Sequence, residues 1–254
     1  MRHKTRWHKQ MNLINFDKLG LMPNQLVDGD PTECAALTTT DIVGNILGIP
    51  FDPDYSYATT LRLQGLPPNT SGLDPFATMQ SAIYYGCLPV SQETFTALSN
   101  GELYIANWQN YSPMERQVAL RYTMNGVMTL GADFSAILNY LANNQWCVSL
   151  PVKWYQNFMA APQGLLTDPQ GAYSNHNIEV VGVDYRGYLI VKSWLGKGWG
   201  DNGYGYLSKE IFDLIAVNSF AFDPAGIRWL QILGLLLTRF PALVLTPQLI
   251  NANE

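Results

Sequence analysis

The sequence predicts an α+β fold with a helical half before about residue 144 and an antiparallel β half after it. Helical hydrophobic patterns dominate the first half, whereas short runs rich in β-branched and aromatic residues follow Asn144. The chain has 254 residues, of which 47% are hydrophobic, so it can bury a substantial core. The interface between two such halves is a common place for a functional site.

The first helix is expected over residues 31–47, PTECAALTTTDIVGNIL, and is expected to be buried. Asp30 can cap its N-terminus, Pro31 suits the first helical position, and Glu33 stands three residues after the cap. Cys34 then falls in the first turn of this helix.

Turn residues separate the remaining helices of the first half. Residues 51–75 are rich in Pro, Gly, Asn and Asp, so we expect this segment to be mostly loop. Phe76 to Tyr85 is expected to form a short helix. Residues 114–142 carry a longer helical pattern that is interrupted around Gly131.

The second half is expected to form short antiparallel strands. The strand-like runs are Trp146 to Leu150, Ile178 to Val183, and Tyr188 to Val191. The sequence GKGWGDNGYG at 196–205 is dense in Gly, Asp and Asn, which predicts a tight turn that leads into another short strand.

Residues 23–210 are expected to form the folded domain, with the helical half over about 23–144 and the β half over about 145–210. Residues 1–22 are a basic arm, expected to be either a solvated segment or a contact for an anionic partner. This arm lacks the apolar run of a secretory signal peptide, which favours the cytoplasm or a viral particle as the location.

Residues 211–254 are expected to be an apolar C-terminal extension. Its sequence WLQILGLLL, at 229–237, is almost wholly apolar but falls short of the roughly 18 residues that a membrane-spanning helix needs. Two interpretations remain open. The extension packs on the main domain as a helix, or residues 229–245 dock on a protein partner or a membrane interface.

Composition excludes several classes of protein. The net charge of −5 argues against a dedicated nucleic-acid binder, so we expect no such partner beyond a weak contact of the basic arm. The three cysteines, Cys34, Cys87 and Cys147, are widely spaced and odd in number, which predicts neither a disulfide framework nor paired zinc ligands. We expect no metal and no cofactor, and we interpret Cys87 and Cys147 as packing residues.

Cys34 and His176 form the candidate catalytic pair. A cysteine in the first turn of a helix has a stabilised thiolate, because unpaired N–H groups and the helix dipole favour an anion there. Glu33 disfavours a thiolate unless its carboxylate points away. His176 stands at the start of a strand, and its distance from Cys34 along the chain fits the roughly 130–150 residues expected for such a pair. Together they make a workable nucleophile and base.

The segment SNHNIEVVGV at 174–183 resembles the histidine strand of papain-like cysteine peptidases. The run IVK at 190–192 and the turn GKGWGDNGY at 196–204 resemble the next strand and glycine-rich turn of that family, and the turn is the most specific match. Residues 31–44 fit its nucleophile helix. The resemblance implies a papain-like fold and peptide-bond hydrolysis by Cys34 and His176 through an acyl-thioester.

The residue that orients the histidine departs from the family pattern. In the family this residue is an asparagine that precedes a tryptophan. Counting back from the glycine-rich turn puts Ser193 at this position, whereas a one-residue slip puts Lys192 there. We assign the role to Ser193, because a hydroxyl can accept a hydrogen bond from the histidine N–H.

The oxyanion hole departs as well. The family uses a glutamine six residues before the cysteine, where this chain has Asp28, whose carboxylate would repel a developing negative charge. Gln25 can serve in its place if the loop holds about three extra residues.

Two functional hypotheses follow from the resemblance. The first is an active cysteine peptidase with a peptide or protein substrate. The alternative is a catalytically decayed papain-like module that acts as a structural or docking piece of a larger assembly, such as a virion of a phage that encodes it. Dinucleotide binding by the glycines of 196–205 is disfavoured, because that turn leads into a strand rather than a helix.

Overall fold

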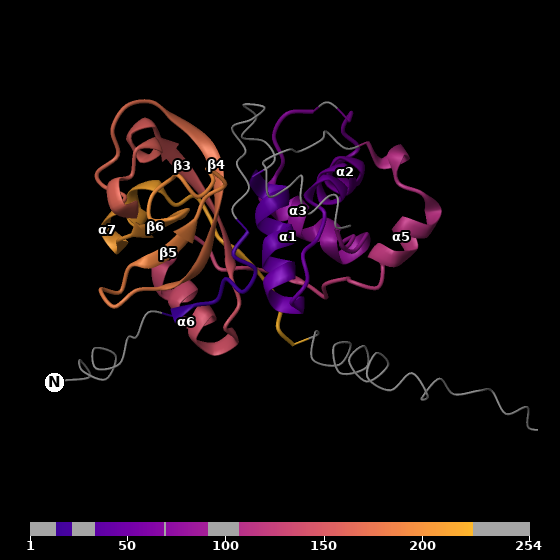
Figure 1. The fold of residues 1–254 in the computed structure, drawn as a ribbon, viewed down its shortest axis with the longest axis horizontal. Coiled ribbons are helices and arrows are strands. Elements are labelled where there is room, and N and C mark those ends of the chain that lie inside the picture. Colours follow the sequence, from indigo (N-terminus) through magenta and orange to yellow (C-terminus); the bar gives the residue numbers. More distant parts are fainter. Residues whose placement is uncertain (1–13, 22–33, 69, 91–106, 226–254) are drawn as a thin grey trace, which may run out of the picture.

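A computed structural model describes residues 14–21, 34–68, 70–90 and 107–225. It consists of a helical half and a sheet half that lie side by side, with helix α1 (Cys34–Leu47) between the other helices and the sheet (Figure 1). The predicted α+β class is therefore confirmed.

The helical half is built around α1, in which every residue from Cys34 to Ile46 is buried. Helices α2 (Pro53–Gln64) and α3 (Pro75–Tyr84) pack against it. A 3₁₀ turn η3 (Trp108–Asn110) and helix α5 (Pro113–Ala119) complete this half.

The expectation that residues 51–75 are mostly loop is wrong, because α2 occupies the first part of that segment. Asp52 caps α2 by accepting hydrogen bonds from the backbone N–H groups of Asp54 and Tyr55, and Pro53 stands at its first position. Gly65 ends the helix with φ of 67°. The turn-forming residues therefore mark the two ends of a helix.

The other half is a sheet whose strand pairings are all antiparallel. The strand order is β2-β7-β3-β4-β5-β6, and β1 pairs with β4. The bounds are Ile14–Asn15 for β1, Val127–Thr129 for β2, Val148–Tyr155 for β3, Tyr173–Val183 for β4, Leu189–Lys192 for β5, Tyr204–Leu207 for β6 and Phe220–Phe222 for β7.

Four further helical segments accompany the sheet. Helix α6 (Phe134–Asn144) and helix α7 (Lys209–Ile215) pack against each other, and α7 also contacts β3. The 3₁₀ turns η4 (Gln156–Met159) and η5 (Pro162–Gly164) follow β3.

The long helical pattern expected over 114–142 is instead two helices, α5 and α6, with strand β2 between them. Asp133 starts the second helix by accepting from the N–H groups of Ser135 and Ala136. Gly131, with φ of 76°, lies in the turn before that cap, so the predicted interruption marks a true break.

The fold continues past residue 210, where the sequence suggested that the domain ends. Phe212, Ile215 and Phe222 are fully buried, and β7 pairs with both β2 and β3. The fold also includes part of the expected basic arm, since β1 pairs with β4 and the N–H of Phe16 donates to the carbonyl of Val181. Residues 226–254, which include the expected docking segment 229–245, lie outside the described residues.

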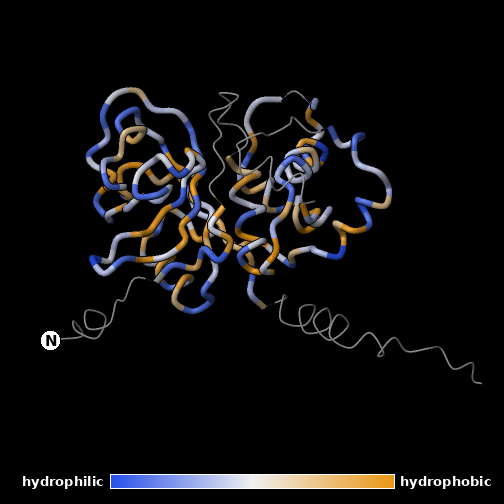
Figure 2. The backbone as a smooth tube through the Cα atoms, in the orientation of Figure 1, coloured by the Kyte–Doolittle hydropathy of each residue, from blue (hydrophilic) through white to orange (hydrophobic). Residues whose placement is uncertain are grey.

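The core crosses the junction of the two halves. Ile42 and Val43 of α1 belong to the same buried cluster as Val181 of β4, Ile190 of β5 and Phe222 of β7. Figure 2 shows apolar segments of both halves in the interior. Because α1 packs directly on the sheet, residues at its start are held against β4. Among the described residues, none belongs to a helix that is long and apolar enough to cross a membrane.

Candidate active site

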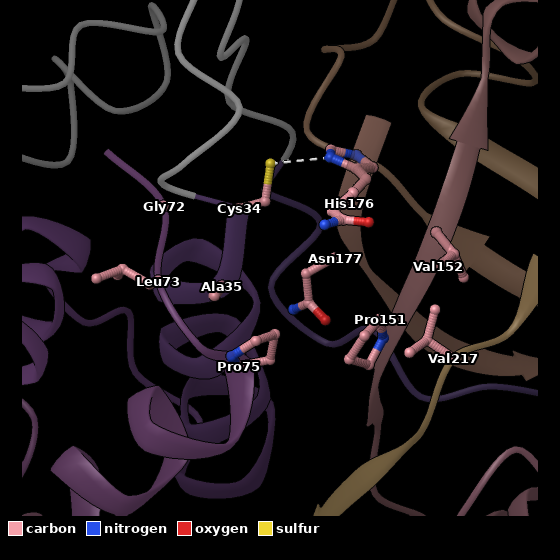
Figure 3. A pocket seen from close by; sticks show the side chains of 11 residues that line it. Cys34, Ala35, Gly72, Leu73, Pro75, Pro151, Val152, His176, Asn177 and Val217 are labelled. Carbon is pink, nitrogen blue, oxygen red and sulfur yellow. Dashed lines mark hydrogen bonds between the residues drawn. The ribbon is translucent and has the colours of Figure 1, made fainter. Parts of the chain in front are cut away.

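Cys34 and His176 meet at the junction of the two halves. Cys34 is the first residue of α1, and His176 lies on β4, which pairs with β3 through His176 and Val152. The Sγ atom of Cys34 lies 3.1 Å from Nδ1 of His176 (Figure 3). This distance is within hydrogen-bond reach for a thiol and an imidazole nitrogen, so the proton of the nucleophile has an acceptor in place.

Ser193 contacts the opposite nitrogen of the same ring. Its Oγ lies 3.3 Å from Nε2 of His176. In the tautomer that carries its proton on Nε2, the N–H donates a hydrogen bond to Oγ of Ser193. Nδ1 is then free to accept a hydrogen bond from Cys34, so this one tautomer serves both contacts. The structure thus brings Cys34, His176 and Ser193 into one line of contacts, and Ser193, rather than Lys192, faces the histidine.

The environment of His176 keeps its ring neutral. The ring of Trp154, on β3, packs against that of His176 with 4.9 Å between their centroids. Burial lowers the pKa of His176 to about 4, because an imidazolium loses hydration in this environment. A neutral ring at neutral pH can act as a base. No local sequence pattern marks Trp154, because only the pairing of β3 with β4 brings its ring to His176.

Comparisons with known proteins identify similar sequences and a similar fold. No family model matches the sequence. Macrodontain-1 of Ananas macrodontes is 22% identical over 181 residues, which cover 67% of this chain and 85% of that protein. Ananain of Ananas comosus is 33% identical over 72 residues, but this match covers 27% of this chain and only 21% of ananain. The crystal structure of xylellain, a cysteine protease from Xylella fastidiosa, matches with a TM-score of 0.67 at 13% identity, over 83% of this chain and 85% of xylellain.

The chain has the papain-like fold. Its distinguishing feature is that a serine hydroxyl contacts the histidine where the family has an asparagine amide. Ser193 is fully buried, so its hydroxyl contacts the ring without competition from bulk water.

The surroundings of Cys34 are only partly described. The described part of helix α1 begins at Cys34, whereas the sequence predicted a helix from residue 31 with Cys34 in its first turn, and residues 31–33 lie outside the described residues. Gln25, the candidate oxyanion donor, and Asp28 lie outside the described residues, as do the expected helix cap at Asp30 and the acidic neighbour Glu33. Their predicted roles therefore stay predictions.

The other two cysteines differ from Cys34 in their surroundings. Burial raises the pKa of the Cys87 thiol to about 12. It also raises the pKa of Cys147 well above its ordinary value, and the nearby Glu179 adds to the effect. Both thiols are inert by this criterion, which agrees with their interpretation as packing residues.

A pocket of about 360 Å³ opens beside the Cys34–His176 pair. Residues of α1 and of the segment before α3 form one wall, whereas β3, β4 and the segment after α7 form the other (Figure 3). No local sequence pattern marks this pocket, because its walls come from five separate segments. Its apolar side chains away from the pair are Leu73, Pro75, Pro151, Val152 and Val217.

The described residues contain no cluster of three or more His, Cys, Asp or Glu side chains that could hold a metal ion.

Proposed function

We propose that this protein is a cysteine peptidase in which Cys34 is the nucleophile and His176 is the general base. The contact of 3.1 Å between Cys34 Sγ and His176 Nδ1 carries this proposal. The position of Cys34 at the start of α1, the pocket beside the pair and the likeness to macrodontain-1 and xylellain support it.

The acylation step follows from the contacts of the pair. The thiol proton of Cys34 moves to Nδ1 of His176, and the sulfur attacks the carbonyl carbon of the scissile amide. The backbone N–H of Cys34, with Gln25 as the second expected donor, stabilises the oxyanion. The C–N bond then breaks, His176 gives its proton to the leaving amine, and the acyl group remains on sulfur as a thioester.

The deacylation step uses the same groups in reverse. His176 takes a proton from water, whose oxygen attacks the thioester carbonyl, and the C–S bond breaks. The proton returns to sulfur, so the product is a carboxylic acid and Cys34 is regenerated. Ser193 accepts from Nε2–H throughout, which keeps Nδ1 directed at the sulfur.

The pocket suggests a class of substrate. Most of its wall residues are apolar, although Asn175 and Asn177 of β4 also line it, and two of the apolar ones are prolines, whose restricted backbones give a fixed shape. An apolar side chain of a peptide substrate gains the most from burial there. We therefore expect cleavage of peptides with an apolar residue near the scissile bond.

The alternative of a decayed module predicts a different state of the thiol. In a module that has lost catalysis, nothing selects for an imidazole at hydrogen-bond distance from the cysteine. Cys34 and His176 retain this contact, which favours the enzyme.

Selective alkylation tests the proposal. A limiting amount of iodoacetamide at about pH 6 should modify Cys34 much faster than Cys87 or Cys147, because only a thiolate reacts readily. The rate at Cys34 should fall by at least about tenfold in His176→Ala, since that variant has lost the base. Peptides with apolar side chains should be cleaved by the unaltered protein and not by Cys34→Ala.

Cys87 and Cys147 provide the control within the same sample, since all three cysteines are buried but Cys34 is the one that lines the pocket beside His176. Slow and equal labelling of all three cysteines, together with no cleavage of any peptide in a mixed library, would refute the peptidase and leave the structural module.

A further inference from the structure

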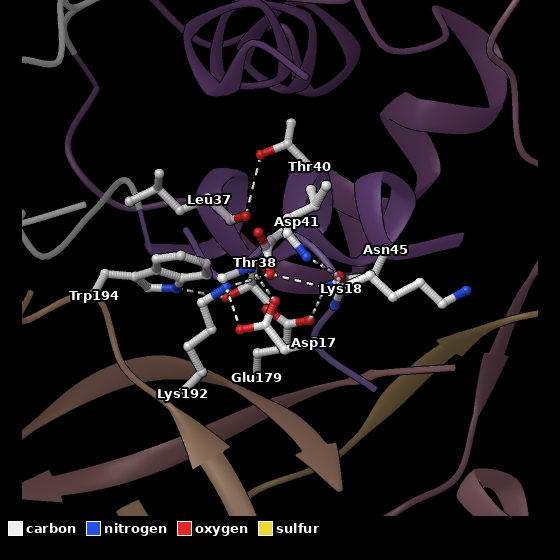
Figure 4. A network of polar contacts seen from close by, with 12 residues as sticks. Asp17, Lys18, Leu37, Thr38, Thr40, Asp41, Asn45, Glu179, Lys192 and Trp194 are labelled. Atoms are coloured by element: carbon white, nitrogen blue, oxygen red, sulfur yellow. Dashed lines mark hydrogen bonds and ion pairs between the residues drawn. The ribbon is translucent and has the colours of Figure 1, made fainter. Parts of the chain in front are cut away.

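A cluster of buried charges lies next to the active site. The Lys192 cluster consists of Lys192 on β5, Asp17 on the N-terminal segment, Asp41 on α1 and Glu179 on β4 (Figure 4). The Nζ atom of Lys192 lies 2.7 Å from Oδ2 of Asp41 and 3.0 Å from Oδ2 of Asp17. Four separate parts of the chain therefore meet at one ammonium group.

The side chains of Lys192 and Asp17 are fully buried, and that of Asp41 is 3% exposed. A buried ammonium is tolerated only with carboxylate partners. Although burial acts to lower the pKa of Lys192, attraction to Asp41, Glu179 and Asp17 raises it above its ordinary value. Burial also raises the pKa of Glu179, which limits the negative charge around the ammonium.

Lys192 and Trp194 flank Ser193, and both bind the helix that carries the nucleophile. Lys192 pairs with Asp41, and Nε1 of Trp194 donates to Oγ1 of Thr38 at 3.0 Å. Thr38 and Asp41 lie about one and two turns after Cys34 on α1. These two contacts fix Ser193 relative to the helix from which Cys34 projects.

Asp17 is the second partner of Lys192 and comes from outside both halves of the site. Its Oδ2 also accepts from the hydroxyl of Tyr204 at 2.7 Å. The segment that carries Asp17 is tied to α1, because Oδ1 of Asn45 accepts from the N–H groups of Lys18 and Leu19 at 2.6 and 3.2 Å. Asp17 therefore holds Lys192 from a fixed position.

We infer that Asp17 is a positioning residue of the active site, which acts through Lys192 to hold Ser193 against His176. The Ser193–His176 contact, at 3.3 Å, is already near the long end of hydrogen-bond distances, so a small shift of β5 breaks it. Without Asp17, the ammonium is drawn toward Asp41 and Glu179, and the end of β5 follows it. This inference rests on the proposed peptidase function.

The test compares Asp17→Asn with the unaltered protein for peptide cleavage and for the pH profile of Cys34 alkylation. A displacement of this kind costs about 10-fold to 100-fold in kcat and leaves KM within about twofold, because no substrate contact changes. The pH profile of Cys34 alkylation in Asp17→Asn should shift toward the profile of Ser193→Ala. In the Ser193→Ala background, Asp17→Asn should have no further effect on kcat, because the two residues act in series.

Asp213→Asn is the matched control. Asp213 pairs with Lys209 at the surface, where both side chains are more than half exposed, so its loss should leave kcat unchanged. Tyr204→Phe is a milder second variant that removes one donor to Asp17 without changing charge, and it should lower kcat in the same direction by a smaller factor.

Four outcomes separate the possibilities. Asp17→Asn and Tyr204→Phe can lower the melting temperature and still leave kcat and the pH profile of Cys34 alkylation unchanged at temperatures well below that melting temperature. In that case the cluster only stabilises the fold and the inference is wrong. The inference would also be overturned if the losses of kcat caused by Asp17→Asn and by Ser193→Ala multiplied in the double variant. If Asp17→Asn does not fold, Tyr204→Phe decides by the same criteria. Absence of both cleavage and selective labelling in the unaltered protein instead refutes the peptidase function, and the inference falls with it.

Discussion

Cys34 and His176 are 142 residues apart in the chain, yet their Sγ and Nδ1 atoms lie 3.1 Å apart. The contact exists because α1 packs directly on β4, and both elements contribute to one buried cluster. The proposed nucleophile and the proposed base therefore belong to different halves, and the geometry of the pair depends on how those halves pack.

Ser193→Ala tests the residue that holds the histidine. We expect kcat to fall by about 10-fold to 100-fold, because His176 loses the acceptor that fixes its tautomer. Loss of the aspartate that holds the histidine of a serine-protease triad costs about 10⁴. KM should change little. Steady-state cleavage of an apolar peptide measures both quantities.

Ser219→Ala is the matched control for that variant, since Ser219 is equally buried and its hydroxyl donates to the carbonyl of Gly131, which lies outside the contacts made by His176. Equal losses of kcat in both variants would show that the effect of Ser193 is general destabilisation.

The stability of the protein should fall as the pH drops from about 6.5 to about 4. The pKa of His176 is lowered to about 4 in the folded state, so the unfolded chain, with an ordinary pKa near 6.5, binds the proton first. Since a tenfold change in an ionisation constant is worth about 1.4 kcal/mol, His176 accounts for at most about 3 kcal/mol of this loss. Urea unfolding at several pH values measures it.

His176→Gln should remove this contribution to the pH dependence. If the variant and the unaltered protein lose the same free energy of unfolding between pH 6.5 and 4, the ring is not protected from protonation in the folded state.

The N-cap of α2 gives a pH dependence of the opposite sign. Burial raises the pKa of Asp52 to about 6, so its contribution to stability declines as the pH rises from about 4 through 6. Asp52→Asn keeps an acceptor for the N–H groups of Asp54 and Tyr55 and carries no charge. We expect this variant to match or exceed the unaltered protein in unfolding free energy at pH 8, whereas Asp52→Ala should lose about 1 kcal/mol.

The comparison between pH 5 and pH 8 decides this prediction. A loss of stability in Asp52→Asn that is greater at pH 8 than at pH 5 would mean that the ionised carboxylate is the favoured cap.

The sequence indicated which two residues meet, Cys34 and His176, more readily than it indicated the segments around them. Cys34 and His176 stand in local patterns that carry chemical meaning, namely a helix start and a strand start followed by a glycine-rich turn. Gly200 of that turn is required by the backbone, since a Cβ there would collide with the carbonyl oxygen of Tyr204. Gly164 of η5 packs against the same place, and a Cβ on it would lie 2.6 Å from that oxygen.

The missed features depend on contacts between distant segments. Asp17 lies in a segment that looks like part of a solvated arm, and only the fold brings its carboxylate to Lys192. The walls of the pocket were missed for the same reason, since separate segments of the chain form them. The error at α2 was local, because Asp52 and Gly65 suit turns and helix ends equally well.

The C-terminal boundary of the fold yields a test by truncation. Removal of residues 211–254 takes away Phe212, Ile215 and Phe222, which are fully buried. Truncating one buried Phe typically costs about 3–5 kcal/mol and one buried Ile about 2–5 kcal/mol, so the loss of all three, about 8–15 kcal/mol, is as large as the roughly 5–15 kcal/mol that holds a domain folded. This truncated chain should not fold. Removal of residues 226–254 alone should leave the sheet intact, because β7 ends at Phe222. Circular dichroism and the rate of Cys34 alkylation report on the two truncated chains. Rapid selective labelling of Cys34 in the chain that lacks residues 211–254 would show that α7 and β7 are dispensable for the site.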